Sequence, residues 1–131
     1  MFRSIQNAMK EAKINSDQID YISAHGTATP FNDEMEAIAL NRLDLQNVPV
    51  NSLKGFYGHT LGASGLLETV IAIESANQNT LFESQGFDEI GVSEKINVIE
   101  KNEEASIGIF LKTASGFGGC NTAVIFEKMK H

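Results

Sequence analysis

The stretch that most constrains the fold of this chain is Asn51 to Gly65, which reads NSLKGFYGHTLGASG. It contains four glycines, one lysine (Lys54) and one histidine (His59), and it lies between two apolar pieces. Glycines at this density let a backbone turn sharply and approach a ligand closely. Taken alone, the stretch fits a structural strand-to-helix connection as well as it fits a site. A second segment favours a site, because Ala24 to Pro30 (AHGTATP) places His25 after another strand-like piece.

Hydrophobic periodicity predicts an α/β chain in which strands and helices alternate. Helices are expected over residues 2–13, from Asn32 or Asp33 onwards, and over residues 62–77; the last of these is apolar nearly all round, so we expect it to be buried in a large core or under a partner. Strands are expected at residues 19–24, 48–50, 96–99, 106–112 and 121–127. The last two are joined by a glycine-rich turn, residues 113–119, and should pair antiparallel. We therefore expect a mixed five-stranded sheet with helices on both faces.

Composition narrows the class of protein further. A chain of 131 residues with 42% hydrophobic residues fits one domain with a real core. The net charge of −7 argues against a nucleic-acid surface, and no apolar run reaches membrane-spanning length. The start, MFRSIQNAMKEAK, lacks the apolar core of a secretory signal. A single cysteine, Cys120, rules out an internal disulfide and fits a reducing compartment, so we expect a cytoplasmic protein.

Three side chains could carry chemistry together. Ligands of such sheets bind beyond the carboxyl ends of the strands, and His25 and His59 both follow strand ends. Neutral imidazoles can donate hydrogen bonds to a carbonyl or carboxylate, and the positive charge of Lys54 disfavours their protonation. We expect the two imidazoles to lie close together, with the Lys54 amine on the His59 side. A metal is not expected, because the histidines are 34 residues apart and no further cysteine or carboxylate pattern completes a ligand set.

Three motifs in register carry a family resemblance. The segments are AHGTATPFNDEME (residues 24–36), NSLKGFYGHTLGASGLLE (residues 51–68) and GFGGCN (residues 116–121). They resemble the HGT region, the lysine-containing stretch ending in GH-x-LGA-x-G, and the C-terminal GFGGTN turn of β-ketoacyl-ACP synthases. Their order and spacing also match, so the resemblance covers the chain from about Phe2 to Lys128.

The resemblance implies the thiolase fold, in which two similar α/β halves form a five-layer body. Residues 1–131 would be a single domain, the C-terminal half, with the nucleophilic cysteine in an N-terminal half that is absent here. The isolated chain is therefore expected to be inactive. The implied substrates are carried on the phosphopantetheine of an acyl carrier protein, and no further cofactor is implied. The implied partners are the acyl carrier protein, the N-terminal half and a second subunit in a homodimer or heterodimer, with no nucleic acid and no membrane.

The resemblance also implies roles for residues near the histidines. His25 and His59 resemble the pair that holds the malonyl thioester carbonyl and the enolate oxygen while carbon dioxide is lost, and Lys54 resembles the lysine that supports them. Thr27 and Thr29 match threonines that bind the pantetheine arm, although loop hydroxyls often bond their own backbone.

Three acidic residues match family positions behind the histidines. Asp33 and Glu36 are expected to cap the helix that begins beside them, since an acidic residue followed three positions later by glutamate is typical of a capping box. Glu68 lies on an otherwise apolar helix and is expected to bond within the support of the site.

The C-terminal turn departs from the family pattern. Ser115 stands where the family carries a gating phenylalanine near the nucleophile, and the resemblance places Ser115 and Phe117 at the substrate. A serine cannot fill that volume, so we hypothesise a synthase for stiff or bulky acyl chains, of polyketide or polyene type, rather than a fatty-acid enzyme. Cys120 stands where the family often has threonine, so we expect a buried structural cysteine and not the nucleophile.

Three alternatives stay open at this point. The motif GHTLGASG also suits a thiolase or another thiolase-fold acyltransferase, although Cys120 follows the glycines where thiolases carry their second cysteine before them. A non-catalytic partner subunit of the chain-length-factor kind tends to lose active-site residues, and here both histidines and the lysine are present. The third alternative is a binding or assembly module.

Overall fold

The structure, a computed structural model, describes residues 1–129. In chain order its elements are α1 (Phe2–Ala12), a 3-10 turn η1 (Ser16–Gln18), β1 (Tyr21–Ser23), α2 (Pro30–Asn41), β2 (Pro49–Asn51), α3 (Lys54–Tyr57), a 3-10 turn η2 (Leu61–Ala63), α4 (Ser64–Gln78), β3 (Thr80–Leu81), β4 (Asn97–Val98), β5 (Glu103–Glu104), β6 (Ile109–Gly116) and β7 (Cys120–Glu127).

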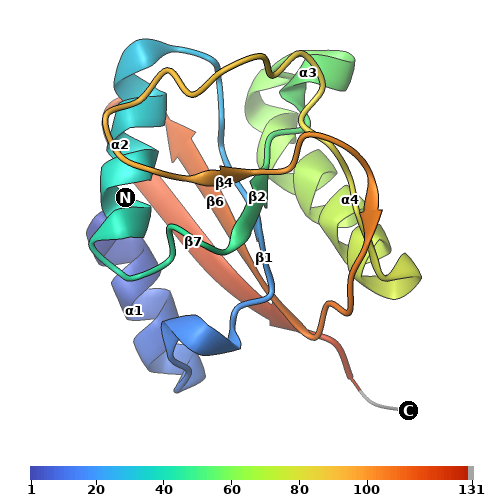
Figure 1. Ribbon diagram of the computed structural model, residues 1–131. Helices are drawn as coiled ribbons and strands as arrows, with labels where there is room; N and C mark the ends of the chain where they lie inside the picture. The colour runs from blue at the N-terminus through green and yellow to red at the C-terminus, as the bar shows by residue number, and fades with distance from the viewer. Residues whose placement is uncertain (130–131) are drawn as a thin grey trace.

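The main sheet has five strands in the order β4-β2-β1-β6-β7, which confirms the predicted mixed sheet (Figure 1). Strands β4, β2, β1 and β6 are parallel, and β7 returns antiparallel to β6. The central strand β1 has Ile22 in register with Val50 of β2 and Leu111 of β6. The carboxyl end of β1 therefore lies between two neighbours, where side chains from several strands can meet.

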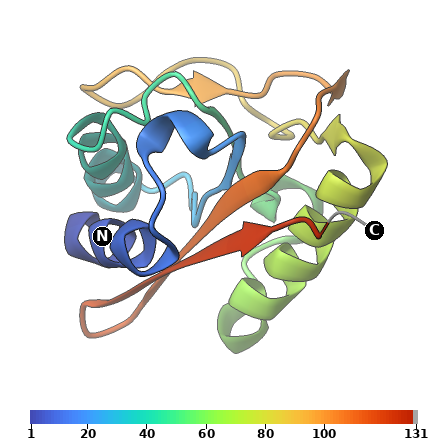
Figure 2. The same ribbon diagram turned by 90° about the horizontal axis from the view of Figure 1, so that it is seen from below.

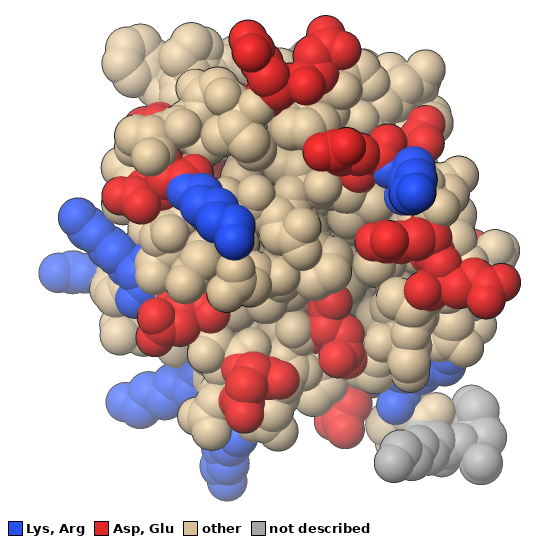
Figure 3. Space-filling view, viewed as in Figure 1, with Lys and Arg blue, Asp and Glu red and all other residues tan. Residues whose placement is uncertain are grey.

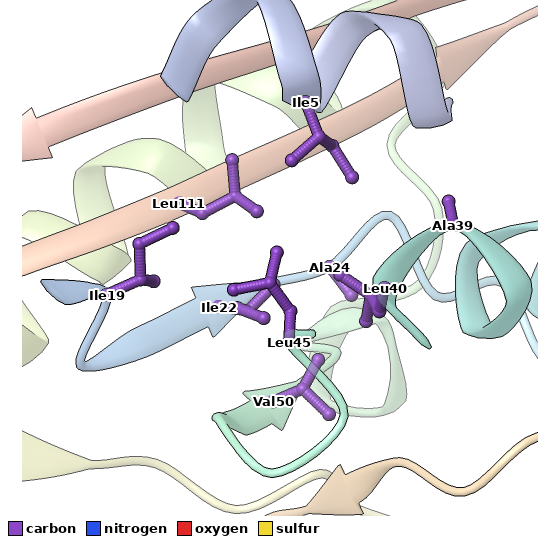
Figure 4. Close-up of a cluster of buried hydrophobic side chains, with 9 residues drawn as sticks. All are labelled: Ile5, Ile19, Ile22, Ala24, Ala39, Leu40, Leu45, Val50 and Leu111. Carbon is purple, nitrogen blue, oxygen red and sulfur yellow. The ribbon is translucent and has the colours of Figure 1, made fainter. Parts of the chain in front are cut away.

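Helices cover both faces of this sheet, as predicted. Helices α1 and α2 lie on one face and α4 lies on the other (Figures 1 and 2). Successive residues of β1 alternate between the two cores, as a strand requires. Ile22 joins the α1–α2 cluster drawn in Figure 4, with Ile5 and Leu111, whereas Tyr21 packs in the α4 cluster with Phe110.

Helix α2 begins at Pro30, two to three residues before the predicted start. Proline is favoured at the first helical position, where no N–H is needed. The capping-box interpretation of Asp33 and Glu36 is wrong: the N-cap is Thr29 and makes no side-chain cap bond. Both carboxylates instead accept hydrogen bonds from the loop that follows β1, as described below.

The C-terminal hairpin also differs from the prediction. Strand β6 was expected over residues 106–112 but runs from Ile109 to Gly116, so the connecting turn is only residues 117–119. Lys112 and Thr113 are therefore buried within a strand, where a turn had been expected from Thr113 onwards. Residues 78–104, predicted as mostly irregular, contribute β4 and a separate antiparallel pair formed by β3 and β5.

Helix α4 has two different faces. The sheet side buries Ala72 and Ala76, together with the charged side chain of Glu68. The opposite side exposes large apolar side chains, namely Leu66, Leu67, Val70 and Ile73. The predicted apolar character all round the helix is thus only partly used inside this chain.

The surface carries the expected acidic excess. Acidic side chains are spread across the face shown in Figure 3, in keeping with the net charge of −7. Within residues 1–129 no helix combines the length and hydropathy needed to cross a bilayer.

Candidate functional site

His25 lies two residues beyond the end of β1 and is buried, with 3% of its surface exposed. Its backbone N–H donates to Glu36 Oε1 and to Thr113 Oγ1, both at 3.1 Å. The next N–H, of Gly26, donates to Glu36 Oε2 at 2.7 Å. Because α2, β1 and β6 all contribute to these bonds, the position of His25 is fixed by the sheet and not by a free loop.

Glycine is required at position 26 for two reasons. Its φ is +41°, and a Cβ there would lie 2.5 Å from Cβ of Ser52. The Ser52 hydroxyl donates to the Gly26 carbonyl at 2.5 Å, which ties the turn after β1 to the end of β2. The His-Gly pair therefore brings the two strand ends into direct contact.

His59 meets His25 as the sequence predicted. The ring centroids are 5.3 Å apart, and the rings are nearly perpendicular at 75°. Unlike His25, His59 is exposed, in the segment between α3 and α4. The residues after it, Thr60 and Leu61, both have a φ of 46°, a left-handed conformation that side-chain-bearing residues adopt at a cost in strain. The backbone is thus bent sharply where it presents the second imidazole.

Lys54 holds the main chain of His25. Its Nζ donates to the His25 carbonyl oxygen at 2.5 Å and forms an ion pair with Glu68 of α4. These contacts are with His25 and Glu68, whereas we had expected them on the His59 side. The Glu68 carboxylate links Lys54 to the buried face of α4, and its role in the support of the site stays a prediction.

The pKa of His25 is lowered from its ordinary value, mainly by burial and secondly by the charge of Lys54. This shift favours the neutral imidazole, which offers one N–H donor and one acceptor nitrogen. Its buried Nδ1 has no hydrogen-bond partner within residues 1–129. Such a ring can donate to an oxygen placed between the two histidines.

The two threonines after His25 bond each other. Thr27 Oγ1 and Thr29 Oγ1 are 2.6 Å apart, and the side-chain amide of Asn32 donates to both, at 3.2 and 2.8 Å. Asp33 Oδ1 accepts from the N–H of Thr27 at 3.2 Å, and burial raises the pKa of this carboxyl. The loop is thus held in shape from within, which is the local role that the sequence also allowed for the hydroxyls.

A cleft of about 760 Å³ opens beside this loop. Its lining includes Lys54, His59 and Thr27, together with the apolar residues Phe87, Ile90 and Val92. Gly55 sits at a close approach in its wall, since a Cβ at this position would lie 2.0 Å from the carbonyl oxygen of Gln85. The site therefore combines a few polar groups with an apolar wall, as small-molecule sites do.

Ser115 and Phe117 make none of the hydrogen bonds described above. The Ser115 hydroxyl donates to Asn121 Oδ1 at 2.8 Å, across the hairpin, and the ring of Phe117 is 99% exposed at the tip. The place of both residues at a substrate stays a prediction. Cys120, predicted to be a buried structural cysteine, is exposed at the first position of β7, so that prediction is wrong.

Two buried residues of β6 belong to the site and were not singled out from the sequence. Thr113 donates its hydroxyl to Glu36 Oε1 at 2.6 Å, and Lys112 Nζ lies 2.7 Å from Glu68 Oε2. The available signal was alternation, because Lys112 lies two residues after the core residue Phe110 and so shares its face. Among residues 1–129 no group of three histidine, cysteine or carboxylate side chains is arranged to hold a metal ion.

Comparison with known proteins agrees with this geometry. Residues 1–88 match the family model "Beta-ketoacyl synthase, C-terminal domain". The chain is 35% identical over 130 residues to 3-oxoacyl-[acyl-carrier-protein] synthase II, chloroplastic, of Arabidopsis thaliana, covering 96% of this chain and 24% of that protein. It is 32% identical over 127 residues to the polyketide biosynthesis malonyl-ACP decarboxylase PksF of Bacillus subtilis, covering 96% of this chain and 30% of that protein.

A solved structure gives the same result for the fold. The AntDE:AntF complex, described as a type II PKS acyl-carrier protein with its ketosynthase bound to the hexaketide, superposes with a TM-score of 0.93 at 27% identity, covering 98% of this chain and 33% of that chain. The present chain thus spans between 24 and 33% of the length of these similar proteins. The strand-end histidines, their spacing and the family match together show that the chain belongs to the β-ketoacyl synthase family, as its C-terminal domain.

Proposed function

We propose that the protein containing this chain condenses an enzyme-bound acyl group with malonyl-ACP and releases carbon dioxide. The observation that carries this proposal is the edge-to-face pair of His25 and His59, 5.3 Å apart at the carboxyl end of β1. In this reaction the bond from the malonyl α-carbon to its carboxylate breaks, and its electrons form an enolate. The enolate carbon then attacks the acyl thioester and releases the cysteine thiolate.

The two imidazoles would stabilise the charge that develops on the thioester oxygen. A donor fixed before the reaction starts needs no reorganisation as the oxyanion forms. His25 meets that requirement, because three hydrogen bonds to Glu36 and Thr113 and the Lys54 contact fix its main chain and that of Gly26. The lowered pKa of its ring keeps a second positive charge out of a site that already contains Lys54.

We propose that the other half of the synthase covers the exposed apolar side of α4 and supplies the nucleophile. The support is the row of exposed side chains, of which Leu66 and Val70 are 73% and 54% exposed. The only cysteine of this chain, Cys120, lies on the β6–β7 hairpin after the glycines. Within residues 1–129 no hydrogen bond joins its thiol to a basic side chain. The single exposed cysteine also supports a cytoplasmic, reducing location.

An acyl carrier protein is the proposed donor of malonyl groups. The support is the cleft lined by Thr27 and Lys54, which is open to the surface and has several apolar residues in its lining. A flexible phosphopantetheine arm can reach a recessed site of this kind while its carrier stays outside. A similar ketosynthase was solved with its acyl-carrier protein.

A malonyl-ACP decarboxylase is a second candidate, favoured by the similarity to the B. subtilis protein of that name. Both reactions use the same histidine pair to stabilise the enolate, so the residues of this chain fit either. They differ in the fate of the enolate, which is protonated in the decarboxylase and attacks an acyl thioester in the synthase. Product analysis therefore separates them: β-ketoacyl-ACP indicates the synthase, and acetyl-ACP alone indicates the decarboxylase.

The experiment replaces each histidine in the full-length protein. His25→Ala and His59→Ala should still allow acyl transfer to the nucleophile but slow the loss of carbon dioxide from malonyl-ACP. Removing one fixed oxyanion donor costs on the order of 3 kcal/mol, about a hundredfold in rate. The matched control is His131→Ala, the remaining histidine, which lies outside the described residues. Decarboxylation at the normal rate by His59→Ala would refute the proposed role of the pair.

A further inference from the structure

Lys112 is a buried cation in the middle of β6, with 4% of its surface exposed. Its Nζ donates to the Thr113 carbonyl at 2.6 Å and to the carbonyls of Ala24 and Ser23 at 3.2 and 3.3 Å, and it forms an ion pair with Glu68 Oε2 at 2.7 Å. These oxygens come from β1, from the residue after it, from β6 and from α4. A lysine this deep in a core is rare unless it is paired.

Burial lowers the pKa of Lys112, whereas the oxygens around its Nζ, above all the Glu68 carboxylate, favour the ammonium form. An ammonium group has three N–H donors and no acceptor, so each hydrogen can point at an oxygen. A neutral amine would direct its lone pair at one of these oxygens. The buried carboxylate of Glu68 forms ion pairs with both Lys54 and Lys112.

The contacts of Lys112 converge on the support of His25. Two of its oxygens belong to Ser23 and Ala24, the residues directly before His25. A third belongs to Glu68, whose other oxygen pairs with Lys54, and Lys54 in turn donates to the His25 carbonyl. Thus the two carbonyls before His25 accept from Lys112, its own carbonyl accepts from Lys54, and the two lysines share one carboxylate.

We propose that Lys112 is a positioning residue for the histidine site: a tethered cation that occupies a cage of oxygens and so aligns Glu68, Lys54 and the backbone that presents His25. The inference rests on the proposed function, in which a fixed His25 donates to the thioester oxygen. Lys112 does not reach the substrate; it acts through the residues it holds. Small misplacements of such donors are costly, since a shift of about 1 Å can reduce a rate roughly a hundredfold.

Two variants of the full-length protein separate the charge from the volume of Lys112. Lys112→Ala removes both and leaves room beside Glu68, so small amines can enter. Lys112→Met removes the charge but fills the space. The matched control is Lys128→Met, because Lys128 also donates to a carbonyl, that of Ala76 at 2.8 Å, but lies after β7 and away from the histidines.

The expected result is that kcat for condensation falls about 10–100-fold in both Lys112 variants, with little change in KM for malonyl-ACP, and is unchanged in Lys128→Met. Methylammonium or ethylammonium should restore part of the rate to Lys112→Ala, whereas tetramethylammonium, which has no N–H, should not. Neither methylammonium nor ethylammonium should restore the rate of Lys112→Met. Two results would overturn the proposal. One is a normal kcat in Lys112→Ala; the other is an equal loss of kcat in both Lys112 variants with no recovery when the amines are added to Lys112→Ala.

A second measurement covers the case in which the variants do not fold. In the wild-type protein, a caged ammonium should give a slowly exchanging 1H–15N side-chain signal for Lys112, and Glu68→Gln should shift it. A Lys112 signal that exchanges as fast as that of an exposed lysine would contradict the cage. This measurement needs no turnover, so a wild-type protein that fails to condense would count against the proposed function and not against the role of Lys112.

Discussion

At the scale of single residues, one carboxylate decides where the buried histidine sits. Glu36 accepts from the N–H groups of His25 and Gly26 and from the hydroxyl of Thr113. Backbone N–H groups at a strand end need acceptors once they are buried, and here a helix of the next layer supplies them. The same residue therefore closes the turn after β1 and links that turn to β6.

This arrangement predicts that Glu36→Gln destabilises the protein. An amide keeps one acceptor oxygen but turns a donor toward the remaining hydrogens, which leaves a buried N–H or hydroxyl unsatisfied. Leaving one buried hydrogen-bonding group without a partner lowers the free energy of unfolding by about 1–3 kcal/mol. Urea unfolding of the two proteins measures the difference. Glu34→Gln on the same helix is the control, because Glu34 bonds the exposed Ser93, and it should change little. Equal stability of Glu36→Gln and wild type would show that the carboxylate is not needed.

The sequence predicted that the two histidines lie together, but it did not predict which residues support them. His25 and His59 could be found because each follows a strand, and parallel strands end at one edge. Glu36 was misread because three-residue spacing from Asp33 fits a helix cap, while its partners are backbone groups in another segment. Lys112 was missed because a lysine near a glycine-rich turn indicates a surface, and only Glu68, 44 residues away in the sequence, makes its burial tolerable.

At the scale of elements, helix α4 has one side buried against the sheet and one apolar side exposed to solvent. Glu68, Ala72 and Ala76 face the sheet, and the apolar row on the other side faces outward. The prediction that this helix needs cover on most sides was read from its composition alone. What covers the outer row could not be predicted from periodicity, since a large core and a partner leave the same pattern.

We predict that Val70→Lys prevents association with the other half of the synthase without unfolding this domain. Val70 is 54% exposed, so a lysine at this position would be solvated in the isolated domain. In the complex with the other half it would be a buried, unpaired charge. Calorimetric titration with the separately produced N-terminal half should show affinity lower by at least about tenfold, or ~1.4 kcal/mol. Glu11→Lys on α1, in the opposite layer, is the control. Unchanged affinity of Val70→Lys would place the other half elsewhere.

At the scale of the whole molecule, the sheet brings the histidines and their supporting lysine to one edge. The chain supplies the imidazole pair and its lysine support, and it presents them beside an open cleft. The mixed sheet with helices on both faces could be predicted, because alternating strands and helices allow few arrangements. The short strands β3 and β5 could not, because two-residue strands have no period to read.

The chain by itself is predicted to form no carbon–carbon bond from acyl-ACP and malonyl-ACP. The reason is that the proposed nucleophile belongs to the other half of the synthase, and Cys120 of this chain lies exposed on the β6–β7 hairpin. Mass spectrometry of the carrier-bound products is the measurement, and adding the N-terminal half should restore the product. Condensation by these 131 residues alone would contradict the division of labour proposed for the two halves.

The hydrogen bonds that fix His25 also determine when its backbone can become ordered during synthesis on the ribosome. Its N–H partner Thr113 lies 88 residues further along the chain, and Thr113 joins Glu36 across 77 residues. A growing chain that has made the strand, the loop and the histidine still lacks the last acceptor until nearly the whole domain has been translated. Long-range closures of this kind come late because their loop entropy must be overcome first. The backbone of His25 can therefore be fixed only after Thr113 has been translated, later than every residue that lines the cleft.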